Sequence, residues 1–198
     1  ELVYVFDLAG DLKDRLVATN REKITDLDWC EWATDSRLVC QVSGMANGST
    51  GGLLPFEWLF AVNDDGSGFT ELSQRQSANA VQNLQYRGDV IAFDVGGEQG
   101  QILMTRQYVP EINAATRTYK DERGFGVDLV DAVTARRRTR EGADAMAVRY
   151  VTDAEGQVRI KVRALLDNNG RLTGEYVYLY RTPGSTTWKK FERLTVDG

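Results

Sequence analysis

Hydrophobic residues gather in short runs separated by turn-forming residues, a pattern typical of an all-β protein. The clearest example lies between residues 24 and 72, where two hairpins follow each other. The runs are 26–33, 37–42, 57–62 and 69–72. The sequences TDS (34–36) and NDDGSG (63–68) between them contain Asp, Ser, Asn and Gly, which favour turns. This stretch therefore predicts four antiparallel strands.

The second of these hairpins recurs along the chain. Its copies begin near Tyr4, Leu59, Val127 and Val177. Further apolar runs lie between successive copies, at 24–42, at 81–86, 90–93 and 101–109, and at 147–152 with 159–166. Repeats of four strands each are typical of a β-propeller. We therefore expect an all-β fold, a partial β-propeller with about three four-stranded antiparallel blades plus half a blade.

The repeat divides the expected propeller domain into four units. These are a half blade at 1–20 and blades at 21–75, 76–142 and 143–198. One alternative is open, because Leu129, Ala132, Val133 and Arg136 would share one face of a helix at 128–141.

Charge and hydropathy bear on whether the chain binds nucleic acid or spans a membrane. The formal net charge of the 198 residues is -5, which disfavours a surface that follows nucleic-acid phosphates. The basic run at 136–140 is interpreted as a solvated strand edge. Because nowhere do about 18 apolar residues follow one another, we expect no membrane span.

Several segments resemble a known family. They are VFDL (5–8), WCEW (29–32) with RLVC (37–40), LFAVNDDGSG (59–68), GVDLVD (126–131) and YLYR (178–181). In this order they resemble the amino-terminal propeller of bacterial prolyl oligopeptidase family serine peptidases, the branch with acylaminoacyl and dipeptidyl peptidases. The resemblance implies partners that this chain lacks, namely further blades, a carboxy-terminal α/β-hydrolase domain and peptide substrates.

The catalytic groups of that family are absent from the sequence. The chain contains no histidine and no G-x-S-x-G nucleophile turn, so a Ser-His-Asp triad is impossible within it. No two glutamates are adjacent either, and the pair that holds the substrate amino terminus in the dipeptidyl-cleaving branch therefore has no counterpart. We assign no catalytic, cofactor-binding or metal-binding residue and expect no cofactor.

The two cysteines are candidates for a disulfide. If the hairpin closes symmetrically about Asp35, Cys30 lies opposite Cys40 at a spacing that a disulfide accepts. A slip of one residue would instead place Cys30 opposite Gln41, and two buried free thiols are the alternative. A bridge would fit an oxidising compartment, so we expect a periplasmic or secreted protein and keep the cytoplasm as the alternative.

Two functions remain open at this point. In the first, the chain is a non-catalytic propeller segment of a prolyl oligopeptidase-like serine peptidase that shields the active site and gates peptide access. In the second, it is part of a stand-alone propeller that acts as a protein-binding platform. For an isolated segment of either kind, we expect self-association through the open blade faces.

Overall fold

The computed structural model describes residues 2–8, 10, 14–19, 25–47, 51–84 and 86–195, with side chains up to residue 191. Within these ranges the chain is all-β, as the sequence predicts, and its single helical segment is a short 3-10 turn, Val95–Gly97. The described part of the chain holds no helix with the length and apolar character needed to cross a membrane. Residues 20–24, around the expected limit of the half blade, lie outside the described ranges.

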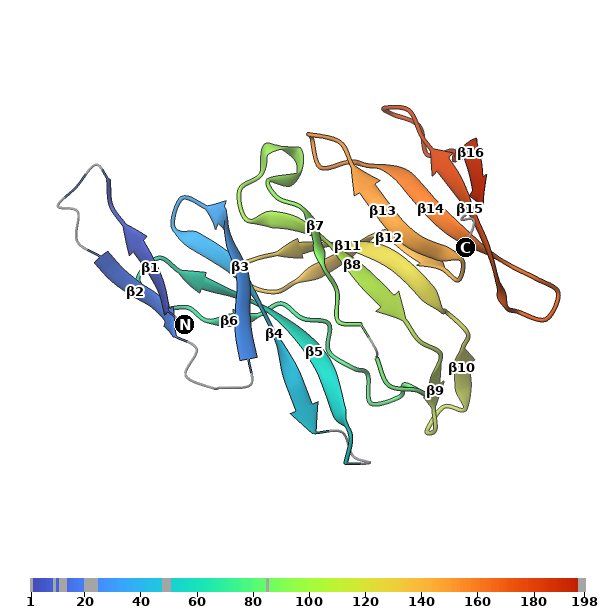
Figure 1. The fold of residues 1–198 in the computed structure, drawn as a ribbon, viewed down its shortest axis with the longest axis horizontal. Coiled ribbons are helices and arrows are strands. Elements are labelled where there is room, and N and C mark those ends of the chain that lie inside the picture. Colours follow the sequence, from blue (N-terminus) through green and yellow to red (C-terminus); the bar gives the residue numbers. More distant parts are fainter. Residues whose placement is uncertain are drawn as a thin grey trace.

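The strands form one two-stranded sheet, three four-stranded sheets and a separate hairpin, all antiparallel (Figure 1). The N-terminal pair is β1 (Leu2–Phe6) and β2 (Asp14–Thr19). The first sheet is β3 (Thr25–Thr34), β4 (Arg37–Asn47), β5 (Leu53–Asn63) and β6 (Thr70–Glu71). The second sheet is β7 (Val90–Ala92), β8 (Gln101–Tyr108), β11 (Gly124–Asp131) and β12 (Arg137–Asp144). The third sheet is β13 (Ala147–Thr152), β14 (Val158–Leu166), β15 (Leu172–Tyr180) and β16 (Lys189–Thr195).

Three details of the second sheet differ from the expectations. Residues 81–84 and 86 form no strand, and Gln85 between them lies outside the described residues; an isolated bridge joins Ala80 to Glu111 just before this segment. Strand β12 continues to Asp144, two residues beyond the expected limit at 142. The helix considered at 128–141 is wrong, because β11 and β12 occupy that stretch as a hairpin.

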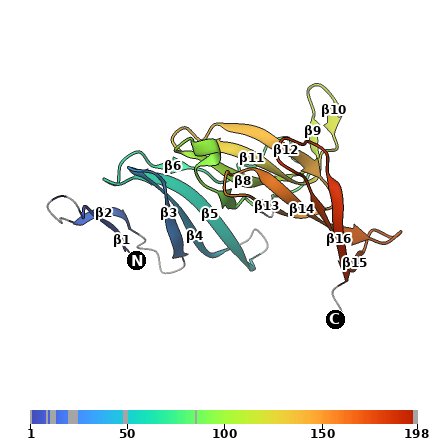
Figure 2. The ribbon, with the colours of Figure 1, turned by 90° about the horizontal axis from the view of Figure 1, so that it is seen from above.

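A small hairpin between β8 and β11 was not anticipated. Its strands are β9 (Glu111–Asn113) and β10 (Thr118–Lys120), and it projects away from the second sheet in both views (Figures 1 and 2). The Asn113 side chain accepts hydrogen bonds from the backbone N–H groups of Ala115 and Thr116, which closes the turn.

The sheets follow one another in chain order (Figures 1 and 2). Buried apolar side chains fill each space between them. Strand β4 shows how one strand serves two such spaces. Val39 faces Ile102 of the second sheet, whereas its neighbours Leu38 and Cys40 face Val17 of the N-terminal pair. Because side chains alternate along a strand, a strand covered on both faces is apolar at consecutive positions. This is why the β4 sequence shows no hydrophobic–polar alternation.

A chain of hydrogen bonds joins the first and second sheets at the tip of the β3–β4 hairpin. The Gly100 N–H donates to the Ala33 carbonyl at 2.7 Å, and the Ala132 N–H donates to the Gly100 carbonyl at 2.8 Å. The chain closes with the Arg37 side chain, whose Nε donates to the Ala132 carbonyl at 2.8 Å. Gly100 has a φ of 77°, a conformation that glycine adopts without strain.

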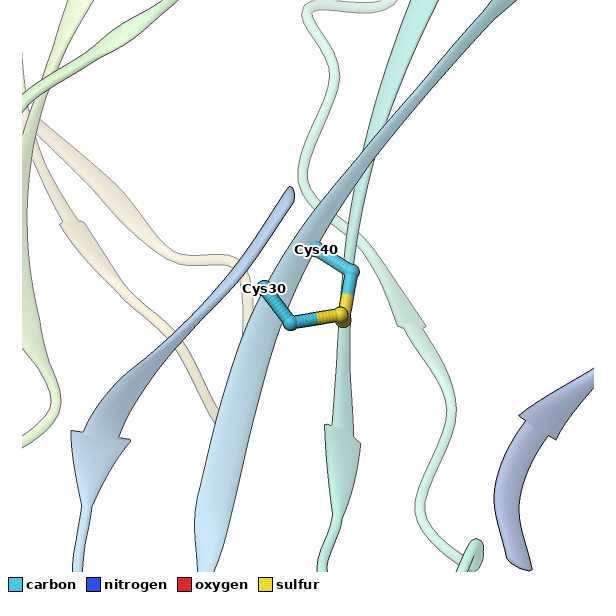
Figure 3. Close-up of a disulfide and its surroundings, with 2 residues drawn as sticks. All are labelled: Cys30 and Cys40. Atoms are coloured by element: carbon cyan, nitrogen blue, oxygen red, sulfur yellow. A yellow bond between two sulfur atoms is a disulfide. The ribbon is translucent and has the colours of Figure 1, made fainter. Parts of the chain in front are cut away.

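A bulge in the same hairpin sets the register of the cysteines. Thr34 pairs with Arg37 around the turn, and this register alone would place Cys30 opposite Gln41. The register shifts between Trp32 and Thr34, so Ala33 is an extra residue and Cys30 lies opposite Cys40. Their sulfur atoms are bonded at 2.03 Å across the two strands (Figure 3).

Reduction of this disulfide is expected to lower the free energy of unfolding by about 2–3 kcal/mol, because the bridge closes a short loop in the unfolded chain. Urea denaturation with and without dithiothreitol measures the difference. Since the chain has only two cysteines, the double variant C30A/C40A is the control and should not respond to reductant. Two titratable thiols in denatured, unreduced protein would contradict the prediction.

Candidate functional site

The first strand of each four-stranded sheet lies at a sheet edge, and these three edges meet around one cavity. Side chains of β3, β7 and β13 and of their neighbours line this space of about 660 Å³, which we call the inner cavity. The Thr152 hydroxyl on β13 donates to the Ile91 carbonyl of β7 at 3.1 Å and holds two of the edges together. Cavities of this size hold small molecules or a few residues of a peptide.

Aromatic side chains form one wall of the inner cavity. Trp29 on β3 and Phe93 after β7 meet edge to face with their ring centroids 6.4 Å apart. The indole N–H of Trp29 donates to the Gln41 side-chain oxygen at 2.9 Å, which fixes the ring orientation. This wall offers a rigid apolar contact surface at a low cost in conformational entropy.

Polar side chains of β8 and of the segment before β7 also line the inner cavity and are held by hydrogen bonds with one another. The Thr105 hydroxyl accepts from the Asp89 backbone N–H at 2.9 Å and bonds the Tyr86 hydroxyl at 3.0 Å. Burial, followed by the hydrogen bond with Asp89, raises the pKa of the Tyr86 phenol above its ordinary value. The phenol is therefore neutral at physiological pH.

Carboxylates bring negative charge to the inner cavity. Glu31 and Asp89 line it, and Glu57 lies close enough to Asp89 and Asp28 for their charges to act on it. Burial and then these two carboxylates raise the pKa of Glu57. Arg149 on β13 also lines the cavity and supplies the positive charge.

The inner cavity offers two features that suit the binding of an extended peptide. The edges of β3 and β13 that face the inner cavity pair with no other strand in the described ranges. Such edges present backbone N–H and C=O groups to an extended peptide, while the aromatic wall can hold its side chains.

The structure places the residues singled out in the sequence elsewhere. Cys30 and Cys40 lie on the opposite face of the first sheet from the Trp29 wall, in the apolar layer against the N-terminal pair. Among the described residues, no group of His, Cys, Asp or Glu side chains is arranged to hold a metal ion.

The basic run at 136–140 needs one correction. Strand β12 is an edge strand, and Arg138 and Arg140 on it, together with Arg136 just before it, are exposed as expected. Arg137 instead turns inward: its side chain is 21% exposed and faces the buried Asp128 of β11. Alternation along β12 separates it from its neighbours, so one arginine of the run is structural.

The inner cavity was not found by sequence reasoning. Trp29 belongs to a strand-forming run, and nothing in that run distinguishes a tryptophan at a cavity wall from one in a core.

In comparisons with known proteins, no family model, no curated protein and no solved structure matches this chain.

Proposed function

We propose that the chain is a wedge of a β-propeller, with three blades and the outer half of a fourth, from a prolyl oligopeptidase-like serine peptidase. The observation that carries the proposal is the stacking of three four-stranded antiparallel sheets in chain order, with an apolar layer between each pair of neighbours. Blades of a propeller pack in this way around a central channel.

The positions of the segments that resemble the peptidase family support the assignment. They lie at corresponding places in successive sheets: 59–62 on β5, 126–131 on β11 and 178–180 on β15. Each of these strands is the third of its sheet in chain order. The likeness therefore follows the repeated unit of the fold.

The proposed role of the segment is to shield the active site and to guide peptides along the inner edges. In a propeller the first strand of each blade faces the channel, which here corresponds to β3, β7 and β13. A peptide passing these edges meets the Trp29 and Phe93 wall on one side and the Arg149 side on the other. Hydrolysis itself is assigned to a domain outside residues 1–198, because this chain has no histidine.

The isolated 198-residue chain is expected to hydrolyse no peptide or ester, whereas a fluorophosphonate should label the parent protein on a serine outside residues 1–198. In the parent, Trp29→Ala should raise the KM for peptides several-fold with little change in kcat, because it removes contact area far from the reacting bond. Mass spectrometry of the labelled peptide and steady-state kinetics measure these effects.

The control variant is Trp32→Ala, which removes a half-exposed tryptophan of the same strand outside the inner cavity. Saturable turnover by the purified segment, blocked by a serine reagent, would overturn the assignment of catalysis to another domain. A parent without a reactive serine would favour the stand-alone binding platform.

A further inference from the structure

A second cavity lies on the other side of the molecule, between the outer edges of the first and second sheets. It has a volume of about 610 Å³ and lies between the end of β6 with residues 72–75 and the strands β8 and β12. Three arginines line it: Arg75, Arg106 and Arg137. We call this space the outer cavity.

The two inner arginines flank one buried carboxylate. Asp128 of β11 is fully buried, and its two neighbours in the sheet, β8 and β12, carry Arg106 and Arg137. Arg106 Nη1 lies 3.4 Å from Asp128 Oδ2, and Arg137 Nη1 lies 3.6 Å from the same oxygen. Both cations therefore share a single oxygen atom at long distances.

This arrangement leaves buried polar atoms without hydrogen bonds. Within the described part of the chain, no hydrogen-bond partner lies within reach of Arg106 Nε, Arg137 Nη1 or Asp128 Oδ1. Buried polar groups are normally satisfied, and an orphaned set beside a cavity indicates a missing water or ion. The remaining contacts of the arginines hold them in place: Arg137 donates to the Leu72 carbonyl, and Arg106 lies over the Tyr108 ring at 4.5 Å.

The charges around the outer cavity do not balance. Arg75, Arg106 and Arg137 face the carboxylates of Asp128 and Glu71, so one positive charge is in excess within a chain of net charge -5. Burial has the largest influence on the pKa of Arg137 and lowers it, whereas the charge of Asp128 raises this pKa. A cation that loses hydration without full compensation gains from a further anion.

We propose that the outer cavity binds an oxyanion, a carboxylate or phosphate group, through Arg75, Arg106 and Arg137. A guanidinium group can donate two parallel N–H bonds to two oxygens of a carboxylate or of a phosphate group. Thr70 and Gln74 also line the cavity and supply neutral polar groups. The site is separate from the inner cavity and does not depend on the proposed peptidase role.

The test measures the affinity of the 198-residue chain for sodium phosphate and for sodium acetate by isothermal titration, with chloride at matched ionic strength as the reference. Arg75→Gln should weaken binding about tenfold, since it removes an exposed cation without disturbing the buried pair. Arg171→Gln, which removes an exposed arginine of a distant turn, is the matched control and should leave the affinity unchanged.

A second variant, which is expected to raise the anion affinity, makes the test more stringent. Asp128→Asn keeps the side-chain shape but removes the internal negative charge, so anion affinity should rise roughly tenfold. Phosphate binding without acetate binding would identify the ligand as a phosphate group, acetate binding alone would identify it as a carboxylate, and binding of both would show that the site accepts either oxyanion. No binding above the chloride reference, or equal affinity in Arg75→Gln and wild type, would overturn the proposal even if Asp128→Asn failed to fold.

Discussion

Replacement of Arg37 by leucine is expected to lower the free energy of unfolding by about 4 kcal/mol, among the largest effects of any single substitution in this chain. Arg37 is 4% exposed and stands at the first position of β4, where the first and second sheets meet. The leucine side chain retains the apolar contacts of the arginine stem. It offers no donors, however, to the acceptors that bind the guanidinium in the wild-type chain.

The guanidinium has four neutral acceptors. Nε donates to the Ala132 carbonyl at 2.8 Å and Nη1 to the Asn63 side-chain oxygen at 2.6 Å. Nη2 donates to the Gly68 carbonyl at 2.9 Å and to the Thr70 hydroxyl at 2.8 Å. Burial lowers the pKa of Arg37, and the charge of Asp131 partly opposes this. Because a buried acceptor without a donor costs about 1–3 kcal/mol, the loss of several such bonds accounts for the expected total.

Urea denaturation measures the Arg37 effect, with Arg171→Leu as the exposed control. Arg37→Lys should recover only a minor part of the lost stability, because an ammonium group cannot serve acceptors in a planar fork. A decrease below about 1 kcal/mol for Arg37→Leu would mean that water replaces the guanidinium and that the hydrogen-bond chain does not hold the sheets together.

The sequence predicts the repeated hairpins because their turns have local chemical signals. The NDDGSG turn shows this, since the Asp65 side chain accepts from the Ser67 N–H and Gly66 has a φ of 80°. The bulge at Ala33 has no such signal, although it decides whether Cys30 faces Cys40 or Gln41. Its cause is tertiary: the Ala33 carbonyl accepts from Gly100 in another sheet.

The run at 81–86 shows where pattern reasoning failed. It contains the apolar residues Val81, Leu84 and Tyr86, but two of its backbone N–H groups bond to a loop carbonyl and to a side chain. The Val81 N–H donates to the Pro110 carbonyl, and the Leu84 N–H donates to the Gln76 side chain. Strand propensity is weak against such context, so an apolar run of this length does not by itself determine a strand.

Both cavities combine residues that are far apart in the sequence. The inner cavity requires Trp29, Phe93 and Arg149 from three different sheets, and the outer cavity requires Arg75 beside Arg106 and Arg137. No regular spacing of charged residues along one strand or helix marks these cavities in the sequence. They can therefore be recognised only once the packing of the sheets is known. The all-β class with antiparallel sheets was therefore accessible from sequence, whereas the sites were not.

The second large effect expected is self-association of the isolated chain through the N-terminal pair. One face of β1 and β2 covers the apolar layer with Val3 and Val5, but the other face carries Leu2, Tyr4, Phe6 and Leu16, all exposed. Tyr4 and Leu16 are directly paired across the strands, so the four side chains form one patch. Contiguous apolar patches of this kind mark interaction surfaces.

The size of this patch is sufficient for association. Half-exposed large side chains together present roughly 300–400 Å², which at about 25 cal/mol per Å² corresponds to somewhat under 10 kcal/mol before the costs of ordering. Light scattering should therefore show oligomers whose population rises with protein concentration, and the double variant Y4S/F6S should shift the equilibrium to the monomer. Val81→Ser, which removes an exposed apolar residue from a loop away from the patch, is the control and should not. A wild-type chain that stays monomeric at high concentration would show that the patch is tolerated in water and would remove this argument for a neighbouring blade.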